Sequence, residues 1–100
     1  MEVEIARQDG EEKRVVTLDY AAGGLKLFTE DSGPTVRRMF GSSSYEISTV
    51  VAASAMPALA MAALTELLQG NPSADAALKD LCNRHAIAFE TEIGTWGWVD

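Results

Sequence analysis

The stretch that decides the fold runs from Ile47 to Thr65, ISTVVAASAMPALAMAALT, and it contains no charged side chain. Residues 47–51 alternate between two faces, which is typical of a β-strand. After Ser54 the period changes to about four, and Pro57 lies where the first turn of a helix tolerates a missing amide hydrogen. The stretch therefore predicts a strand followed by a buried helix. We interpret it as scaffold, which leaves function to the charged segments on either side.

The residues before this stretch read as strands separated by turns. Alternating apolar and polar side chains predict strands around residues 2–6, 14–20, 25–28, 36–40 and 45–51. Residues that favour turns lie between them, at Asp9-Gly10, Ala21-Ala22-Gly23-Gly24 and Asp31-Ser32-Gly33-Pro34. Five strands are therefore expected before the first long helix.

Two helices and a last strand are expected after it. Ser54 is a candidate N-cap, and Gly70 lies where a helix usually ends in a left-handed residue. Ser73 then begins a second helix, and residues 87–93 alternate again as a final strand. The order predicts a single α+β domain over residues 1–100, with a mostly antiparallel sheet and both helices packed on one of its faces.

Charge limits the classes of partner. The chain has 15 acidic and 8 basic side chains, a formal net charge of -7. Such a surface repels phosphate backbones, so we expect no nucleic-acid partner, and a basic protein is the natural counterpart. A net charge of this size is also explained by solubility alone, without any partner. Serine, threonine and proline interrupt the uncharged stretch, so we expect no membrane span.

Cysteine and histidine, which serve in many catalytic and metal sites, are scarce. Cys82 and His85 are the one cysteine and the one histidine, too few for a disulfide or for a zinc site. With an N-terminus that lacks the pattern of a signal peptide, this favours a cytoplasmic protein without a cofactor. Cys82 is expected in the core, and His85 at a helix C-terminus. No nucleophile, phosphate loop or metal motif indicates an enzyme.

Exposed acids and terminal tryptophans are the candidates for partner contact. Tryptophan is enriched where interfaces concentrate their binding energy, although Trp96 and Trp98 would equally serve as core cover. Arg37 and Arg38 are expected on opposite sides of the fourth strand, where one of them pairs with a neighbouring glutamate. The candidate partner-binding residues are Glu11, Glu12, Asp31, Glu46, Glu90, Glu92 and Trp98.

Part of the chain resembles a group of small, mostly uncharacterised bacterial proteins. The resemblance rests on Asp31-Ser32-Gly33-Pro34, on Val36-Arg37-Arg38-Met39-Phe40-Gly41 with Tyr45-Glu46, on Met56-Pro57-Ala58-Leu59 and on Arg84-His85-Ala86-Ile87-Ala88-Phe89-Glu90. It covers roughly the last seventy residues. Small acidic α+β proteins of this kind are similar to immunity proteins, which neutralise a bacterial toxin by covering its active site. Typical members have an aromatic residue soon after the Tyr-Glu pair, where this chain has Ile47-Ser48-Thr49.

These observations lead to one expected function and one alternative. We expect a non-enzymatic acidic protein-binding domain, most concretely an immunity-like inhibitor of a basic bacterial toxin. The alternative is a homodimeric structural or assembly module that associates through its sheet edge or its alanine-rich helix. A small-molecule pocket between sheet and helices is left open.

Overall fold

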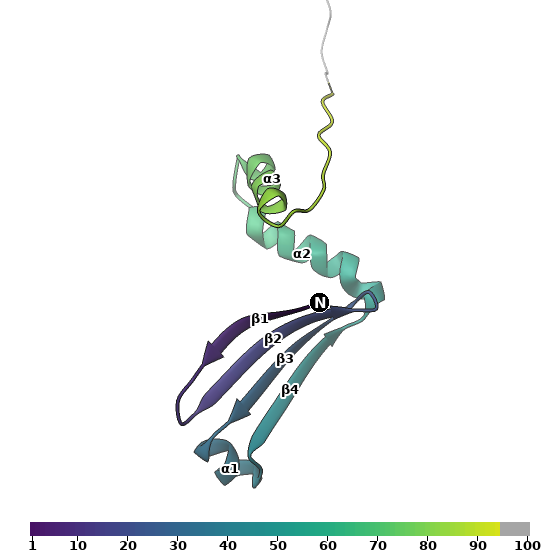
Figure 1. Cartoon of the computed structure of the whole chain (residues 1–100). Coiled ribbons are helices and arrows are strands. Elements are labelled where there is room, and N and C mark those ends of the chain that lie inside the picture. Colours follow the sequence, from purple (N-terminus) through teal and green to yellow (C-terminus); the bar gives the residue numbers. More distant parts are fainter. Residues whose placement is uncertain (95–100) are drawn as a thin grey trace, which may run out of the picture. The chain divides into compact units, whose positions relative to one another are not determined.

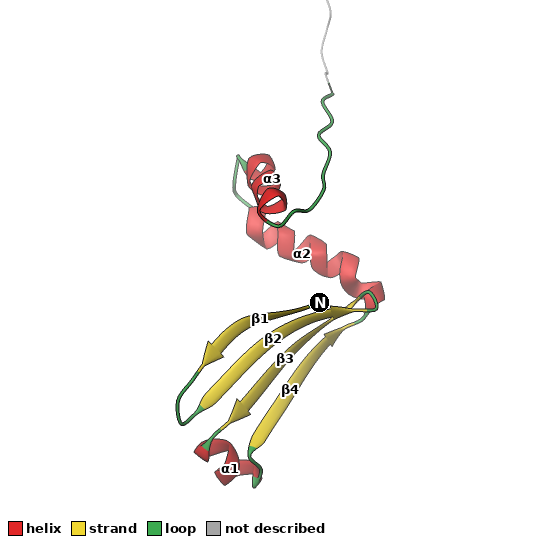
Figure 2. Cartoon of the chain, in the orientation of Figure 1, coloured by secondary structure: helices red, strands yellow, loops and turns green. Residues whose placement is uncertain are grey.

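The computed structural model describes residues 1–94 and shows an α+β chain with an open four-stranded sheet (Figures 1 and 2). Backbone contacts divide the chain into two compact units, Met1–Met61 and a second from Ala62 onward. The elements, in order, are β1 (Glu2–Gln8), β2 (Lys13–Ala21), β3 (Gly24–Ser32), α1 (Pro34–Phe40), β4 (Ser44–Val51), the 3-10 helix η1 (Ala53–Ala55), α2 (Met56–Leu68) and α3 (Ala74–Arg84).

The sheet is an antiparallel meander in which each strand pairs with the next, in the order β1-β2-β3-β4. The β2–β3 hairpin closes through two residues, Ala22 at φ 53° and Gly23 at φ 80°. Positive φ at both central positions is the turn geometry that matches the right-handed twist of paired strands. The predicted α+β class and the antiparallel sheet are therefore confirmed.

The predicted fourth strand, residues 36–40, is wrong, because these residues form α1. Pro34 stands in the first turn, and Gly41 ends the helix in a left-handed conformation, donating its N–H to the carbonyl oxygen of Arg37. A run of five residues is too short for its pattern to separate a strand from a helix. The sheet consequently has four strands before α2, one fewer than expected.

The predicted final strand, residues 87–93, is also wrong, since residues 87–94 form neither helix nor strand. The end of α3 is well defined: Ile87 and Ala86 donate their N–H groups to the carbonyl oxygens of Cys82 and Asn83, and Ala86 has φ 53°. This is the Schellman pattern of a helix C-terminus. Alternation makes a segment fit for a strand, but a strand exists only where a neighbour supplies hydrogen bonds.

Of the residues predicted to mark helix ends, Gly70 and Pro57 are confirmed and Ser54 is wrong. Gly70 has φ 79° just after α2, and Pro57 lies in the first turn of that helix, both as predicted. Ser54 lies inside η1 and does not cap α2. Ser73 occupies the N-cap position of α3, although its side chain makes no capping hydrogen bond.

The packing of α2 and α3 on the sheet stays a prediction. Within residues 1–94 no helix has the length and apolar character to cross a membrane.

Strand alternation and register sort the sheet residues onto two faces. The apolar face carries large hydrophobic side chains, several of them exposed, including Val3 at 49%, Tyr20 at 48% and Ile47 at 51%. The members that define the apolar face are Val3, Val16, Leu18, Tyr20, Leu25, Leu27, Ile47 and Val51. The members that define the charged face are Glu2, Glu4, Arg7, Lys13, Asp19, Lys26, Glu30 and Glu46.

Candidate functional site

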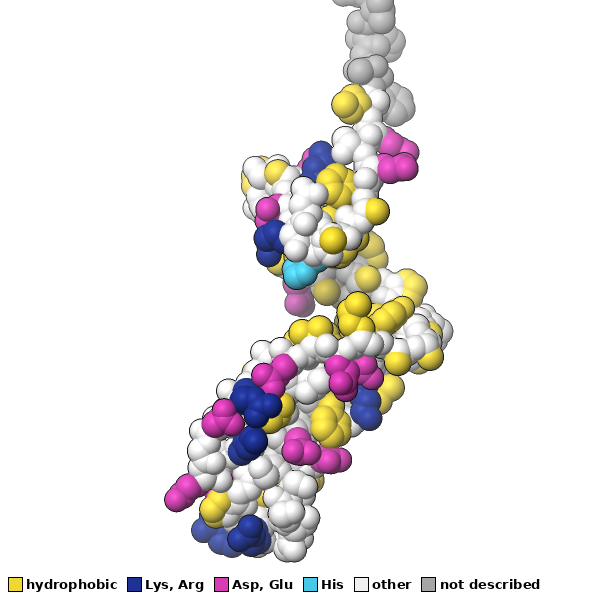
Figure 3. Space-filling model, in the orientation of Figure 1, with side chains coloured by type: hydrophobic (Ala, Val, Ile, Leu, Met, Phe, Trp, Pro, Cys, Tyr) yellow, Lys and Arg dark blue, Asp and Glu magenta, His cyan; other side chains and the backbone are white. Residues whose placement is uncertain are grey.

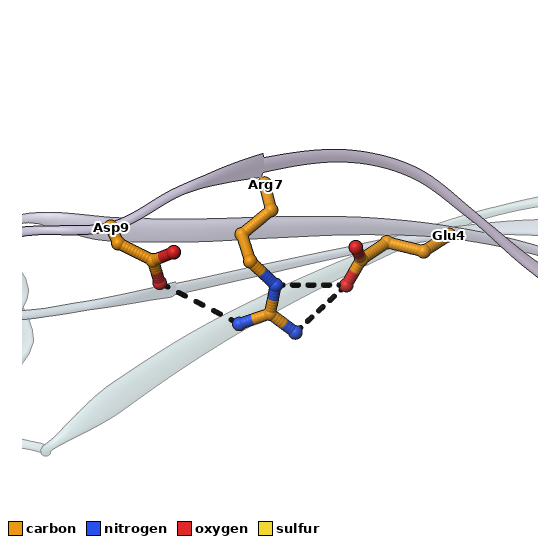
Figure 4. Close-up of polar contacts among 3 residues, drawn as sticks. All are labelled: Glu4, Arg7 and Asp9. Carbon is orange, nitrogen blue, oxygen red and sulfur yellow. Dashed lines mark hydrogen bonds and ion pairs between the residues drawn. The ribbon is translucent and has the colours of Figure 1, made fainter.

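The charged face mixes acids with bases, and Figure 3 shows the two kinds of side chain interspersed over the sheet. Arg7 on β1 is an example (Figure 4). Its guanidinium lies 2.7 Å (Nη2) and 3.0 Å (Nε) from Oε1 of Glu4, and its Nη1 lies 3.6 Å from Oδ1 of Asp9. The hydrogen bond to Glu4 raises the pKa of Arg7 above its ordinary value. One guanidinium therefore faces two carboxylates: Glu4 is the closer partner, and Asp9 is only partly compensated.

Asp31, a predicted contact residue, is held by Arg14 on the neighbouring strand. The register sets the two residues opposite each other, and Arg14 donates from Nε at 2.6 Å and from Nη2 at 2.8 Å to the two carboxylate oxygens. This two-point hydrogen bond lowers the pKa of Asp31. Two parallel bonds of this kind also fix geometry, so the pair aligns β2 with β3.

Glu12, a second predicted contact, is tied to the start of α1. Its Oε1 accepts hydrogen bonds from the backbone N–H of Thr35 at 2.9 Å and from the Thr35 hydroxyl at 2.6 Å. The hydroxyl bond is the larger cause of the lowered pKa of Glu12. A carboxylate at a helix N-terminus satisfies an amide that the helix itself leaves unpaired. We assign Glu12 a structural role in holding α1.

Glu12 and Asp31 line a common recess of about 390 Å³ at one end of the sheet. Both carboxylates are already engaged there, by Thr35 and by Arg14. The recess also holds the one buried apolar side chain of the described residues, Val36, which is 7% exposed. The remaining lining residues are Gln8, Lys13, Arg14 and Thr35.

Glu46, the third predicted contact in the sheet, has a different setting. It lies on β4 directly opposite Glu30 on β3, so that two carboxylates meet on the charged face. Among residues 1–94 neither carboxylate has a hydrogen bond or an ion pair. Directly opposed like charges on neighbouring strands are destabilising. We call Glu30 and Glu46 the carboxylate pair; within the described residues neither acid forms an ion pair, although Glu30 lines a recess together with Arg7 and Lys13.

The remaining predicted contacts lie in other segments of the chain. Glu11 is exposed in the turn between β1 and β2, and Glu90 and Glu92 are exposed in the segment after α3. Trp98, like Trp96, lies outside the described residues. Asp31 points to the other face of the sheet from Glu46, because its register partner is Tyr45. Of the candidates in the sheet, Asp31 and Glu46 therefore lie on opposite faces.

Two arginines of α1 and two side chains of α3 and its C-terminus were also considered as functional candidates. They are Arg37, Arg38, Cys82 and His85. Arg37 and Arg38 lie in the last turn of α1, where positive charge complements the helix dipole, so their predicted placement on opposite sides of a strand is wrong. In the described part of the chain neither pairs with Glu46, and Arg38 reaches the hydroxyl of Thr35 at 3.3 Å. His85 is the C-cap of α3, as expected, whereas Cys82 is half-buried and does not lie in the core that was predicted for it.

Glu30 is the functional candidate that the sequence did not single out. The tight turn at Ala22-Gly23 sets the register of β2 with β3, but the longer connection of residues 33–43, which includes α1, separates β3 from β4. The opposition of Glu30 and Glu46 depends on how that helix is seated. Over residues 1–94 no group of three His, Cys, Asp or Glu side chains is arranged to hold a metal ion.

No protein-family model, no curated protein and no solved structure matches this chain.

Proposed function

We propose that this chain is a non-enzymatic protein-binding domain that receives a basic side chain of its partner at the carboxylate pair. The observation that carries the proposal is the direct opposition of Glu30 and Glu46, with no cation from the described residues on either. A lysine or arginine placed between them would turn a repulsive cross-strand contact into two attractive ones.

The charge of the chain supports the same partner. A net charge of -7 attracts a basic surface over a distance, and the carboxylate pair would give the complex its register. Asp31 contributes less because Arg14 already neutralises it, and Arg7 neutralises one of the two acids beside it. The structure thus supports Glu46 more than Asp31 or Glu12 as a binding residue.

The test titrates the chain with a hexa-arginine peptide at low salt and follows amide chemical shifts. We expect the largest changes on β3 and β4 around Glu30 and Glu46. Glu46→Lys should weaken binding about tenfold, because it replaces attraction by repulsion at short range. It should also raise the free energy of unfolding by about 0.2–1 kcal/mol, because it makes an opposed pair of unlike charges.

The matched control is Glu66→Lys, which makes the same change in net charge on α2. It should affect binding far less than Glu46→Lys. Equal losses in the two variants would mean that the peptide senses net charge alone, and the carboxylate pair would then have no special role.

The more specific form of this proposal is an immunity-like inhibitor of a basic bacterial toxin. It is supported by the acidic charge, the small size and the unmatched acids at Glu30 and Glu46. If a toxin domain is encoded in the adjacent gene, co-expression of this chain should restore growth. Glu46→Lys should abolish that protection although the variant is folded. Full protection by Glu46→Lys would exclude the carboxylate pair as the contact.

A second candidate function is a homodimeric assembly module. The exposed hydrophobic side chains of the apolar face favour it, since contiguous exposed apolar surface is typical of interaction sites. Measuring the molecular mass in solution separates a dimer from a domain that binds only other proteins.

A further inference from the structure

The outer edge of β4 is open for strand pairing. Within residues 1–94 β4 pairs with β3 alone. Proteins usually protect such an edge with a bulge, a proline or several charges. β4, SYEISTVV, has no proline, an uninterrupted register and a single charged residue, Glu46.

The opposite edge of the sheet differs. β1 has an irregularity between Glu4 and Ala6, where its register with β2 shifts, and it carries three charged side chains. Both features discourage pairing with another strand. Of the two edges, that of β4 is therefore the one suited to receive a strand.

The segment 87–93, IAFETEI, has the composition of a strand without a strand partner. Its large apolar side chains are exposed: Ile87 at 54%, Phe89 at 44% and Ile93 at 88%. These side chains alternate with Ala88, Glu90 and Glu92. Exposed apolar side chains and backbone groups without hydrogen bonds are both unfavourable. Pairing of the segment with a sheet would remove both penalties.

The side chains of this segment match β4 on both faces. Placed beside β4, Phe89 and Ile93 would continue the apolar face at Ile47 and Val51, while Glu90 and Glu92 would continue the charged face. Serine and valine neighbours dominate the charged side of β4. The charged side of β4 carries one acid, Glu46, whereas that of β1 carries two acids and Arg7.

We propose that two copies of this chain exchange these segments: residues 87–93 of each copy pair with the open edge of β4 in the other. In one described chain the segment is unpaired, and reciprocal exchange uses both open segments and both open edges in a closed two-fold dimer. The dimer deepens the assembly candidate and is independent of the carboxylate pair.

The first test measures mass and amide hydrogen exchange of the full chain over a range of concentrations. We expect a dimer at high concentration, with the outer amides of β4 and those of residues 87–93 protected. On dilution both sets should lose protection together as the dimer dissociates. Protection that does not change with concentration would mean pairing within one chain, and a monomer at every concentration would also overturn the proposal.

The second test uses proline to remove single amide hydrogens. Neighbouring amides of a strand point to opposite sides, so Glu90→Pro or Thr91→Pro must remove a bond to β4 whatever the register. At least one of them should reduce dimerisation by tenfold or more, whereas Glu90→Gln and Thr91→Val should not. Exchange protection of β1, β2 and β3 checks that each variant is folded.

Dimerisation unaffected by both prolines would exclude the segment as the exchanged strand. Hexa-arginine binding is measured on the same variants, because the proline substitutions leave Glu30 and Glu46 intact. Loss of the dimer with retained peptide binding would support both proposals. A chain that dimerises as expected but does not bind the peptide would contradict the basic-partner proposal alone.

Discussion

Two alanines hold a backbone conformation that glycine usually occupies. Ala22 in the β2–β3 turn and Ala86 after α3 both have φ 53°. The left-handed region brings Cβ close to the following carbonyl oxygen and costs roughly 1–2 kcal/mol for an ordinary residue. In each place a neighbouring structure imposes the conformation: the hairpin at Ala22 and the helix C-terminus at Ala86.

Ala22→Gly should therefore stabilise the protein. Relief of the left-handed strain exceeds the extra entropy that glycine has in the unfolded chain, so we expect a gain of about 0.5–1 kcal/mol in the free energy of unfolding. Urea denaturation measures it. Ala21→Gly is the control, because Ala21 belongs to β2 and has no positive φ, and it should destabilise. Stabilisation by both substitutions would contradict the strain argument.

At the scale of elements, the seven-residue helix α1 depends on contacts from outside it. Glu12 binds its first turn through Thr35, and the ring of Phe40 at its end stacks on Tyr45 of β4, with centroids 4.4 Å apart and an interplanar angle of 6°. A helix this short is marginal without such contacts. They seat α1 between β3 and β4 and so set the register that opposes Glu30 to Glu46.

Acid should weaken this part of the fold. The pKa values of Glu12 and Asp31 are lowered by their partners from ordinary values of 4.5 and 3.8. Lowered values mean that each contact stabilises the fold above the unfolded pKa, and that this stability is lost as the pH falls through the folded pKa. The free energy of unfolding should therefore decline below about pH 4.5.

Urea denaturation over a pH series checks this dependence. Glu12→Gln and Asp31→Asn should each lower stability at neutral pH and make the decline in acid shallower. Glu66→Gln, which leaves both contacts in place, should follow the unsubstituted chain. An unchanged slope in the Glu12 and Asp31 variants would mean that other groups govern acid unfolding.

For the whole molecule, the net charge of -7 and the two-faced sheet imply two kinds of association. A basic partner at the carboxylate pair is attracted through charge. A second copy at β4 would be held by backbone hydrogen bonds and apolar contact. Salt screens the first kind of interaction strongly and the second weakly.

Raising the salt concentration should separate the two. Between about 20 and about 200 mM NaCl the affinity for hexa-arginine should fall by tenfold or more, because the Debye length shrinks to less than the width of the charged face. The dimer should instead become tighter over the same range, because salt screens the repulsion between two copies that each carry a net charge of -7. Sedimentation and peptide titration in the same buffers measure both. A dimer that weakens with salt as the peptide complex does would contradict an exchanged strand.

Local patterns predicted much of the fold and less of the site. Strands β1, β2, β3 and β4, the turn at Ala22-Gly23 and the helix end at Gly70 follow from side-chain period and glycine placement. Residues 36–40 were misassigned as a strand because five alternating positions suit either period. Glu46 was recognised by its charge, but its opposition to Glu30 was not, since charge alone does not show which neighbour a side chain meets.

The amino-acid sequence determined the α+β class, the antiparallel character of the sheet and the acidic charge, because side-chain period, turn residues and ionisable groups are properties of short segments. Tertiary structure decided which acids are neutralised, as at Glu12 and Asp31, and which oppose each other, as at Glu30 and Glu46. It also left residues 87–93 outside the described sheet. The physical reason is that strand pairing, register and ion pairing join residues far apart in the chain, and their energies depend on neighbours that no local pattern contains.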